Sequence, residues 1–314
     1  MADVVQTDRL THRYGERIAL HELSFAVAAG EIVALLGPNG SGKTTLFRIL
    51  STLIPPQDGR ASIFDLNLAD ASARQTVRRS IGVVFQNPSL DKELSAAENL
   101  SYHGNLYGLR GGSLHQRVRE LLARFDLIDR QDERVKTFSG GMRRRVEIAK
   151  GLMNRPRLLL LDEPSTGLDP IARAEVWRYL TEVREKDGVT VLLTTHLMDE
   201  ADRCDRVAIL DAGRLVAQGT PAALKERVGG DVISLSTRDP QTVKRILREK
   251  LSIESGECTD TADGVVRFER PRGHEFVPVL FEAMPAGLVD SVSVGKPTLQ
   301  DVFIDVTGHR FKDD

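Results

Sequence analysis

The chain of 314 residues is long enough for one large domain and a smaller second one, and its 41% of apolar residues can fill a sizeable core. Its formal net charge of −2 argues against bulk binding to nucleic acid, for which a strongly basic domain is expected. The two cysteines, Cys204 and Cys258, are far apart and provide neither a disulfide framework nor a metal-ligand spacing, which favours a reducing, cytosolic compartment.

Membrane-directed segments are not expected from the sequence. The first six residues lack the basic and apolar regions of a signal peptide. Apolar runs such as 32–36 and 158–161 are far shorter than the roughly 20 residues that a membrane helix needs. If the protein works at a membrane, we expect another chain to supply the spanning part.

The first half of the chain alternates between strand and helix patterns. A short apolar run that ends at a glycine is typical of a buried strand, and a longer periodic run that ends at Gly or Pro is typical of a helix. In chain order we predict a strand at 31–36, a glycine-rich turn, a helix at 43–53, a strand at 81–85, helical segments between about 95 and 125 with a break at Gly111 and Gly112, and an arginine-rich helix at 140–153.

The alternation continues to about residue 217. We predict a strand at 158–161, an amphipathic helix at 170–185, a strand at 189–194 and a hairpin with strands at 207–210 and 214–217. Strands that alternate with helices indicate the α/β class, with a mostly parallel sheet covered on both faces.

The pattern changes around Gly229 and Gly230, where we predict a short linker and a smaller second domain. Short strand patterns and helical patterns then follow one another. We expect strands at 232–235, 265–268 and 289–294, and helices at 240–250 and 274–284.

The turn after the predicted strand at 31–36 matches the G-x-x-x-x-G-K-[ST] pattern of a phosphate-binding loop. Its residues are Gly37, Pro38, Asn39, Gly40, Ser41, Gly42, Lys43 and Thr44. Backbone N–H groups and a helix N-terminus would face phosphate oxygens, with Lys43 at the β- and γ-phosphates and Thr44 at Mg²⁺. A purely structural glycine turn is the alternative, whereas a dinucleotide-binding loop fails because no third glycine follows Gly42.

Two acids, Asp162 and Glu163, follow the buried strand at 158–161. Ligands of open α/β sheets bind at the carboxyl ends of strands. Asp162 suits the shell of Mg²⁺, and Glu163 could polarise an attacking water as a general base. The alternative is a strand end capped by two solvated acids.

Further features surround this loop and these acids. They are Phe138-Ser139-Gly140-Gly141-Met142, Ser165-Thr166-Gly167-Leu168-Asp169, Gln86 after the strand at 81–85, His196 after the strand at 189–194, and Tyr14. In order and spacing they resemble the signature loop, D-loop, Q-loop glutamine, switch histidine and adenine-stacking aromatic of the nucleotide-binding subunits of ABC transporters. The resemblance covers residues 1 to about 228.

The resemblance implies a P-loop NTPase fold for residues 1–228, with a mostly parallel sheet, an antiparallel β subdomain and a helical subdomain at about 87–150, followed by a small α+β C-terminal domain at 229–314. It implies an ATPase whose catalytic residues are Glu163, His196 and Lys43. The residues implied to bind ATP are Tyr14, the loop residues 37–44, Thr45, Gln86, Ser139, Gly140, Gly141 and Asp169, and those implied to hold Mg²⁺ are Thr44, Gln86 and Asp162.

In the family, the site at Ser139 faces the γ-phosphate that a second subunit holds, so the resemblance implies an ATP-sandwich dimer. Taken alone, Ser139 could be only a helix N-cap, His196 only a helix-start histidine and Tyr14 only a surface aromatic. The signature usually reads Leu-Ser-Gly-Gly-Gln, so Phe138 and Met142 depart from it while the Ser-Gly-Gly centre is intact. The run Arg143–Arg145 is interpreted as a solvated face without a role in reading bases.

Two segments indicate a branch of the family. Residues 90–100 and 297–303 are similar to segments of exporter ATPases of the daunorubicin-resistance type, which serve ABC-2 permeases. The second segment could equally be a helix N-terminus that packs on its own domain. The resemblance implies a separate polytopic permease, a place at the cytoplasmic face of the cell membrane, and no nucleic-acid partner.

The function expected is an ATP-binding, ATP-hydrolysing subunit that energises export through that permease. An importer ATPase and a soluble ATPase without a transport role are the alternatives. The transported substrate and the choice between homodimer and heterodimer stay open at this point, because the permease, which selects the cargo, is a different chain.

Overall fold

The computed structural model describes residues 3–254, 258–260 and 264–308. The chain forms two compact units, Met1–Val216 and Ala217–Asp314. The first unit ends 12 residues before the predicted linker boundary at 228 and 229. The boundary at 229 therefore stays a prediction.

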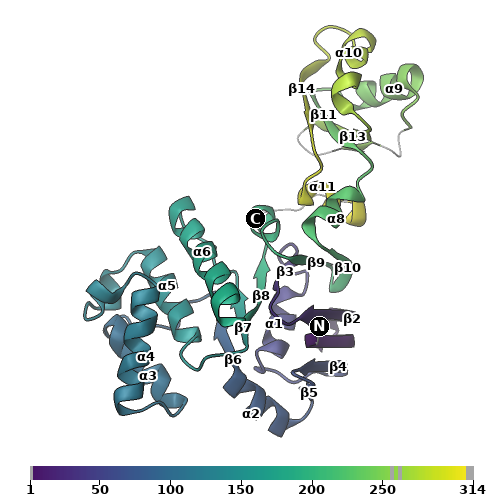
Figure 1. Ribbon diagram of the computed structural model, residues 1–314. Coiled ribbons are helices and arrows are strands. Elements are labelled where there is room, and N and C mark those ends of the chain that lie inside the picture. Colours follow the sequence, from purple (N-terminus) through teal and green to yellow (C-terminus); the bar gives the residue numbers. More distant parts are fainter. Residues whose placement is uncertain (1–2, 255–257, 261–263, 309–314) are drawn as a thin grey trace. The chain divides into compact units, whose positions relative to one another are not determined.

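A mixed, mostly parallel sheet forms the centre of the first unit (Figure 1). Its strand order is β10-β9-β3-β8-β7-β6. β3 pairs in parallel with β8 and β9, and β7 pairs in parallel with β6 and β8. The strands are β3 (Ile32–Leu36), β6 (Ile81–Val84), β7 (Leu158–Asp162), β8 (Thr190–Thr195), β9 (Arg206–Asp211) and β10 (Arg214–Gly219). The predicted strands of this sheet are confirmed.

A second sheet in the same unit is antiparallel, with the order β2-β1-β4-β5. Its strands are β1 (Asp3–Tyr14), β2 (Arg17–Ala28), β4 (Asp58–Ile63) and β5 (Leu66–Asn67). The implied antiparallel β subdomain is thus present. No strand within it was predicted individually.

The helix α1 (Lys43–Leu50) lies between the two sheets and contacts β2, β4, β7 and β8. Its buried residues Leu46, Ile49 and Leu50 belong to one core cluster with residues of both sheets. The short helix α2 (Ala71–Ser80) follows β5. Because α1 begins at Lys43, this packing fixes the phosphate-binding loop at the carboxyl end of β3, inside the parallel sheet.

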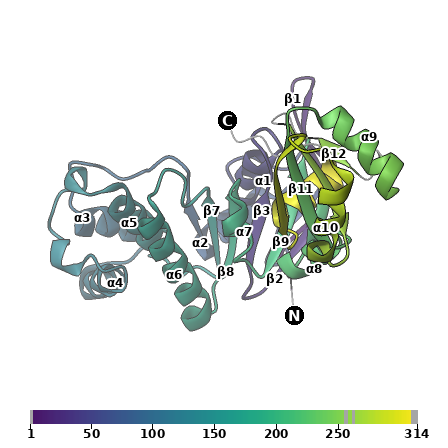
Figure 2. The same cartoon turned by 90° about the horizontal axis from the view of Figure 1, so that it is seen from above.

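Helices α3 (Ala96–Leu106), α4 (Gly111–Arg124) and α5 (Gly140–Gly151) pack on one another and form the helical part of this unit (Figures 1 and 2). The one-turn helices η1 (Ile128–Arg130) and η2 (Val135–Thr137) connect α4 to α5. Ser95 and Glu98 form a capping box that begins α3. A break between two helices is confirmed, but it lies at 107–110, and the predicted Gly111 and Gly112 are the first residues of α4.

Two further helices complete the first unit. α6 (Pro170–Asp187) has Asp169 as its N-cap, Pro170 in its first turn and Gly188 in the left-handed conformation at its end. α7 (Met198–Ala201) follows β8 and packs on β3 and β8.

The second unit contains an antiparallel sheet of order β12-β13-β11-β14. Its elements are α8 (Pro221–Glu226), β11 (Asp231–Thr237), α9 (Pro240–Leu251), β12 (Thr259–Asp260), β13 (Val265–Arg270), α10 (Gly273–Ala283), β14 (Val289–Gly295) and α11 (Leu299–Thr307). Ile233, Leu235 and Phe268 on the sheet form a core with Val243 and Leu247 of α9. The predicted α+β character is confirmed.

Within the residues that the structure describes, none of the helices has the length and apolar character required to cross a bilayer.

Candidate active site

The phosphate-binding loop joins β3 to α1, as predicted. Gly40 and Gly42 have φ values of 82° and 104°, a conformation that residues with a Cβ rarely adopt. A Cβ on Gly37 would lie 2.4 Å from the carbonyl oxygen of Leu210. The loop therefore needs glycine for its backbone path. Asn39 and Gly40 are exposed at its tip, whereas Ser41 is buried.

Lys43 is buried at the start of α1. Its Nζ donates hydrogen bonds to the carbonyl oxygens of Gly37 and Pro38, the latter at 3.0 Å, so the ammonium group lies over the loop. Burial lowers the pKa of Lys43, and the negative charges of Glu163 and Asp162 oppose that shift. Thr44 is exposed beside it, and Thr45 packs inward.

Asp162 is the last residue of β7 and is buried. Thr194 of β8 donates from Oγ1 to Asp162 Oδ1 at 2.6 Å. Burial raises the pKa of Asp162, and the hydrogen bond from Thr194 and the charge of Lys43 oppose that rise. This bond uses Oδ1, and the second carboxylate oxygen of Asp162 could bind a cation.

Glu163 has a left-handed backbone with a φ of 45°, which is uncommon for a residue other than glycine. Its N–H donates to the Thr194 carbonyl oxygen at 3.2 Å and to Thr194 Oγ1 at 3.0 Å. Its own carbonyl oxygen accepts from Arg144 Nη2 at 2.7 Å. These bonds hold a strained backbone in place, as is common at functional sites.

Three side chains surround the carboxylate of Glu163. Gln86 donates from Nε2 to Oε2 at 3.1 Å, and Thr166 donates from Oγ1 to the same oxygen at 3.1 Å. His196 Nδ1 lies 3.3 Å from Oε1, a close approach without hydrogen-bond alignment. The structure thus brings together Gln86, Glu163 and His196, three residues that are distant in the sequence.

Arg144 is buried, so the interpretation of Arg143–Arg145 as a solvated face is wrong for this residue. Its guanidinium donates to the carbonyl oxygens of Pro164, Phe85 and Glu163 at 2.5, 2.9 and 2.7 Å. Arg144 therefore ties α5 to the end of β6 and to the residues that follow β7. A solvated arginine would have left these three carbonyl groups without this partner.

The remaining predicted residues lie elsewhere in the first unit. Ser139 is the N-cap of α5 and accepts from Met142 N at 3.2 Å, and Gly140 beside it is exposed. A Cβ on Gly141 would lie 2.7 Å from Ala172 Cβ, so this glycine permits close packing of α5 on α6. Figures 1 and 2 place α5 beside α3 and α4, away from α1. One copy of the chain therefore does not bring Ser139 to its own phosphate-binding loop.

Asp169 caps α6, and Tyr14 ends β1. Asp169 Oδ1 accepts from the N–H groups of Ile171 and Ala172 at 3.0 and 2.9 Å. The Tyr14 ring is 46% exposed and packs edge-on against His12, with ring centroids 4.9 Å apart. Tyr14 is thus accessible at the surface of the first unit.

The oxygen donors at this site suit Mg²⁺, which binds hard oxygen ligands and usually takes one or two carboxylates together with substrate phosphates. The Thr44 hydroxyl is exposed, the Asp162 carboxylate ends a strand, and Gln86 has an amide oxygen that its bond to Glu163 does not use. In the described part of the chain, no group of three or more His, Cys, Asp or Glu side chains could hold a metal by itself.

Comparison with known proteins decides the family. Residues 20–166 match the model of the ABC transporter family. The daunorubicin resistance ATP-binding protein DrrA2 of Streptomyces coeruleorubidus is 38% identical over 310 residues, which cover 98% of this chain and 95% of that protein.

This chain belongs to the ABC transporter ATP-binding proteins.

Other ABC proteins extend the comparison. The Nod factor export ATP-binding protein I of Sinorhizobium fredii is 37% identical over 317 residues, which cover 98% of this chain and 87% of that protein. The solved structure of CbiO1 from Clostridium perfringens, part of an ABC transporter complex, has a TM-score of 0.68 and 27% identity and covers 80% of this chain and 97% of that one. A dimeric ATP-binding cassette bound to ADP and phosphate has a TM-score of 0.63 and 30% identity and covers 69% and 98%.

The resemblance to exporter ATPases of the daunorubicin-resistance type is thus confirmed. The chain is the ATP-binding subunit of an exporter-type ABC transporter and hydrolyses ATP to drive transport. ABC cassettes form dimers and act together with membrane components of the transporter. The ABC fold is confirmed in both sheets of the first unit.

Sequence reasoning missed several residues of this ABC site. Arg144 and Thr194 hold the backbone of Glu163, and Thr166 contacts its carboxylate. Arg17 Nη2 lies 3.5 Å from the position of a Cβ on Gly40, so a cation lies next to the tip of the phosphate-binding loop. Of these, only Thr166 belonged to a recognised motif.

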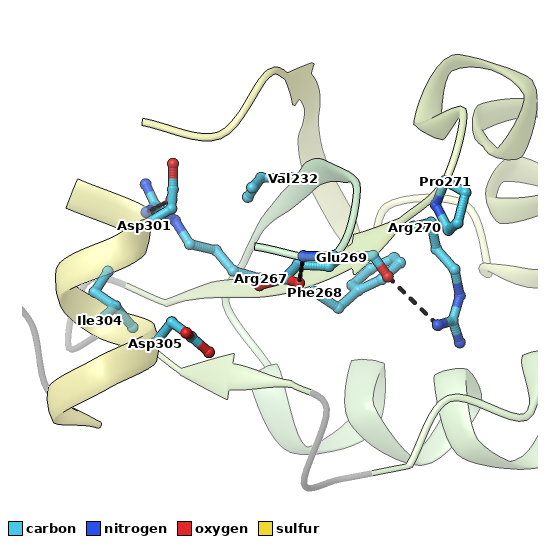
Figure 3. Close-up of a pocket in the computed structure, with 10 residues that line it drawn as sticks. Val232, Arg267, Phe268, Glu269, Arg270, Pro271, Asp301, Ile304 and Asp305 are labelled. Carbon is cyan, nitrogen blue, oxygen red and sulfur yellow. Dashed lines mark hydrogen bonds and ion pairs between the residues drawn. The ribbon is translucent and has the colours of Figure 1, made fainter. Parts of the chain in front are cut away.

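The second unit has a hollow of its own, of about 390 Å³ (Figure 3). Arg267 of β13 forms an ion pair with Asp301 of α11 at 3.0 Å, and Glu269 accepts from Gly229 N at 2.6 Å. Figure 3 shows Arg267 and Glu269 along the strand, with Asp301, Ile304 and Asp305 on α11 at one side of it. The Pro297–Phe303 segment thus forms the start of α11, with Thr298 and Asp301 as a capping box.

Proposed function

We propose that this ABC subunit hydrolyses Mg-ATP with Glu163 as the residue that polarises the attacking water. The observation that carries the proposal is the arrangement of Gln86, Thr166 and His196 around the Glu163 carboxylate. A general base must be within hydrogen-bond reach of its water and must be held in a fixed orientation. Each of the three neighbours limits the positions that this carboxylate can take.

The other residues bind and orient the nucleotide. The N–H groups of the loop 37–42 and the N-terminus of α1 bind the phosphates, and Lys43 exchanges its bonds to Gly37 and Pro38 for bonds to phosphate oxygens. Tyr14 stacks on the adenine ring. Thr44, Asp162 and Gln86 would hold Mg²⁺, which when bound would supply positive charge beside the phosphates. His196 orients the γ-phosphate and the water.

We propose further that the second half of each site comes from another copy of the chain. Ser139, Gly140 and Gly141 form the exposed N-terminus of a 12-residue helix, where backbone N–H groups and the helix dipole favour an anion. A related cassette is described as a dimer with bound ADP and phosphate, which supports the same arrangement here. Asp169 at the start of α6 would lie at the same dimer contact.

The membrane partner is proposed to be a separate polytopic permease of the ABC-2 type, with this chain at the cytoplasmic face of the membrane. A groove of about 550 Å³ in the first unit is lined by Phe85 and Ser89 after β6 and by Tyr102 and Leu106 of α3. Tyr102 is 63% exposed and Leu106 is 82% exposed. Exposed apolar side chains beside a groove suit a short helix of a partner protein.

The experiment combines partner capture with an ATPase assay. We expect the tagged full chain, recovered from gently solubilised membranes, to co-purify with a polytopic membrane protein that mass spectrometry identifies. Lys43→Ala should reduce hydrolysis by at least about 100-fold, because a charge that the phosphates need is removed. Lys186→Ala, which removes an exposed lysine of α6, is the matched control and should hydrolyse ATP normally.

Two results would contradict the proposal. One is normal turnover by Lys43→Ala, which would exclude the phosphate-binding loop as the site. The other is recovery of the chain only with ribosomes or nucleic acid, which would favour an ATPase without a transport role.

A further inference from the structure

A buried ion pair on α5 lies outside the residues that bind nucleotide. Glu147 and Lys150 are one helical turn apart, and their side chains are 2% and 9% exposed. Lys150 Nζ lies 3.0 Å from Glu147 Oε2. Burying two charges is costly, and apolar side chains of similar volume often give equal or greater stability. Net stability is therefore a poor explanation for this pair.

The pair binds a third residue, Ser89, in the loop between β6 and α3. Ser89 donates from its backbone N to Glu147 Oε1 at 2.5 Å and from Oγ to Glu147 Oε2 at 3.3 Å. Lys150 Nζ donates in turn to Ser89 Oγ. Hydrogen bonds to charged groups are the stronger and more directional ones. Ser89, Glu147 and Lys150, the Glu147 cluster, therefore fasten the loop that begins at Gln86 to the middle of α5.

The same loop is also bound to the chain that enters α5. Val135 N donates to the Leu94 carbonyl oxygen at 2.9 Å, and Lys136 N donates to the Lys92 carbonyl oxygen at 3.0 Å. Residue 136 is followed within three positions by Ser139, the N-cap of α5. The loop 86–95 is thus held at Ser89 to α5 itself and at Lys92 and Leu94 to η2, which leads into α5.

We propose that Glu147 is a positioning residue that makes the loop after Gln86 and α5 move as one body. Ser89 and Lys150 also line the groove beside Tyr102 and Leu106. A partner helix that binds in this groove would therefore contact the Glu147 cluster and could displace it. The displacement then reaches Glu163 through Gln86 and reaches the second copy's nucleotide through Ser139. This inference rests on the proposed roles of Gln86 and Ser139.

The test compares two variants of the full chain. Glu147→Gln leaves Lys150 buried without its carboxylate. The double variant Glu147→Leu with Lys150→Met removes both charges and keeps apolar volume. We expect the double variant to melt at or above the temperature of the parent. Both variants should bind a fluorescent ATP analogue with a Kd within about twofold of the parent, because the phosphate-binding loop lies on other elements.

The expected defect is in turnover and in dimer formation. In both variants kcat for ATP hydrolysis should fall about tenfold with KM unchanged. In the Glu163→Gln background, the Mg-ATP concentration for half-maximal dimer formation should rise by a similar factor. Lys150→Arg keeps the charge and should retain most of the parent's kcat.

A stable double variant with the parent's kcat and dimer formation would overturn the proposal, because the cluster would then have only a structural role. The double variant decides the matter even if Glu147→Gln fails to fold. The proposed function is tested by variants that keep the Glu147 cluster intact. It fails if Lys43→Ala still hydrolyses ATP, or if Glu163→Gln does not form a dimer with Mg-ATP.

Discussion

Glu163 combines a strained backbone with a fixed carboxylate. A left-handed conformation costs a residue with a Cβ roughly 1–2 kcal/mol, and here Thr194 and Arg144 hold the backbone by hydrogen bonds on both sides of the peptide. Because β7 ends at Asp162, the turn at Glu163 directs its side chain to Gln86 and His196. The strained residue is thus the one that follows Asp162, and the two adjacent carboxylates contact different partners: Asp162 contacts Thr194, and Glu163 contacts Gln86 and His196.

Asp162 provides a pH-dependent prediction. Burial raises its pKa, so the folded chain disfavours the carboxylate. The cost is absent below the ordinary aspartate pKa of about 3.9, grows as the pH rises through that value and is complete above the raised pKa. Asp162→Asn keeps an oxygen for Thr194 and removes the charge. We expect it to melt at a higher temperature than the parent at neutral pH, with the difference vanishing toward pH 3.

Asp129→Asn is the matched control for this measurement, since Asp129 is exposed on η1. It should leave the melting temperature unchanged at both pH values. A gain in Asp162→Asn that is equal at acidic and neutral pH would contradict the assignment of the cost to the buried charge. Loss of Mg-ATP hydrolysis in the same variant is expected from the proposed metal role.

The residues of the site could be predicted from the sequence where they belong to short contiguous motifs. Lys43, Asp162 and Glu163 follow buried strands, and such patterns can be recognised along the chain. Arg144 could not be found in this way, because its burial depends on Phe85 and Pro164, which only the tertiary structure brings to α5. Charge alone indicated a solvated helix face.

At the scale of elements, the strands of one sheet of the first unit could be predicted from the sequence, and the strands of the other sheet could not. The inner strands β3, β7 and β8 of the parallel sheet are buried at every residue, and each contains a short apolar run. β1 and β2 are longer, but their register shifts at several points, and Arg9 and Glu22 have positive φ values of 46° and 48°. Such bulges interrupt the alternation of buried and exposed residues. The period-two pattern that would predict these strands is therefore broken.

The N-terminus of α5 carries the next prediction. Ser139 accepts from Met142 N, so Ser139→Ala should lower the free energy of unfolding by about 1 kcal/mol. Thr220→Ala removes a similar cap from α8, where Thr220 accepts from Ala223 N at 3.1 Å, and should cost about as much. Only Ser139→Ala should also lower ATP hydrolysis, because only this hydroxyl is proposed to face a phosphate.

The assay is steady-state ATP hydrolysis beside chemical denaturation for both variants. Equal rates of ATP hydrolysis in Ser139→Ala and Thr220→Ala would show that Ser139 acts only as a helix cap. That result would also remove the main reason to propose a shared site.

At the scale of the whole molecule, the division into two units predicts where the chain can be shortened. β10 ends at Gly219, and α8 packs on α11 of the second unit. A chain that ends at residue 219 should melt cooperatively and hydrolyse ATP. A chain that ends at 228 exposes Leu224 and Val228, which are buried in the full chain, and should aggregate more. A folded 1–228 chain beside an unfolded 1–219 chain would instead support the boundary predicted from the sequence.

We propose that two copies of this chain enclose Mg-ATP between the phosphate-binding loop of one and Ser139 of the other. The most direct measurement is the mass of Glu163→Gln in solution, by light scattering, with and without saturating Mg-ATP. We predict a monomer without nucleotide, a dimer with Mg-ATP, and no dimer when Ser139→Ala is added. A Glu163→Gln chain that binds Mg-ATP and stays monomeric would contradict the account.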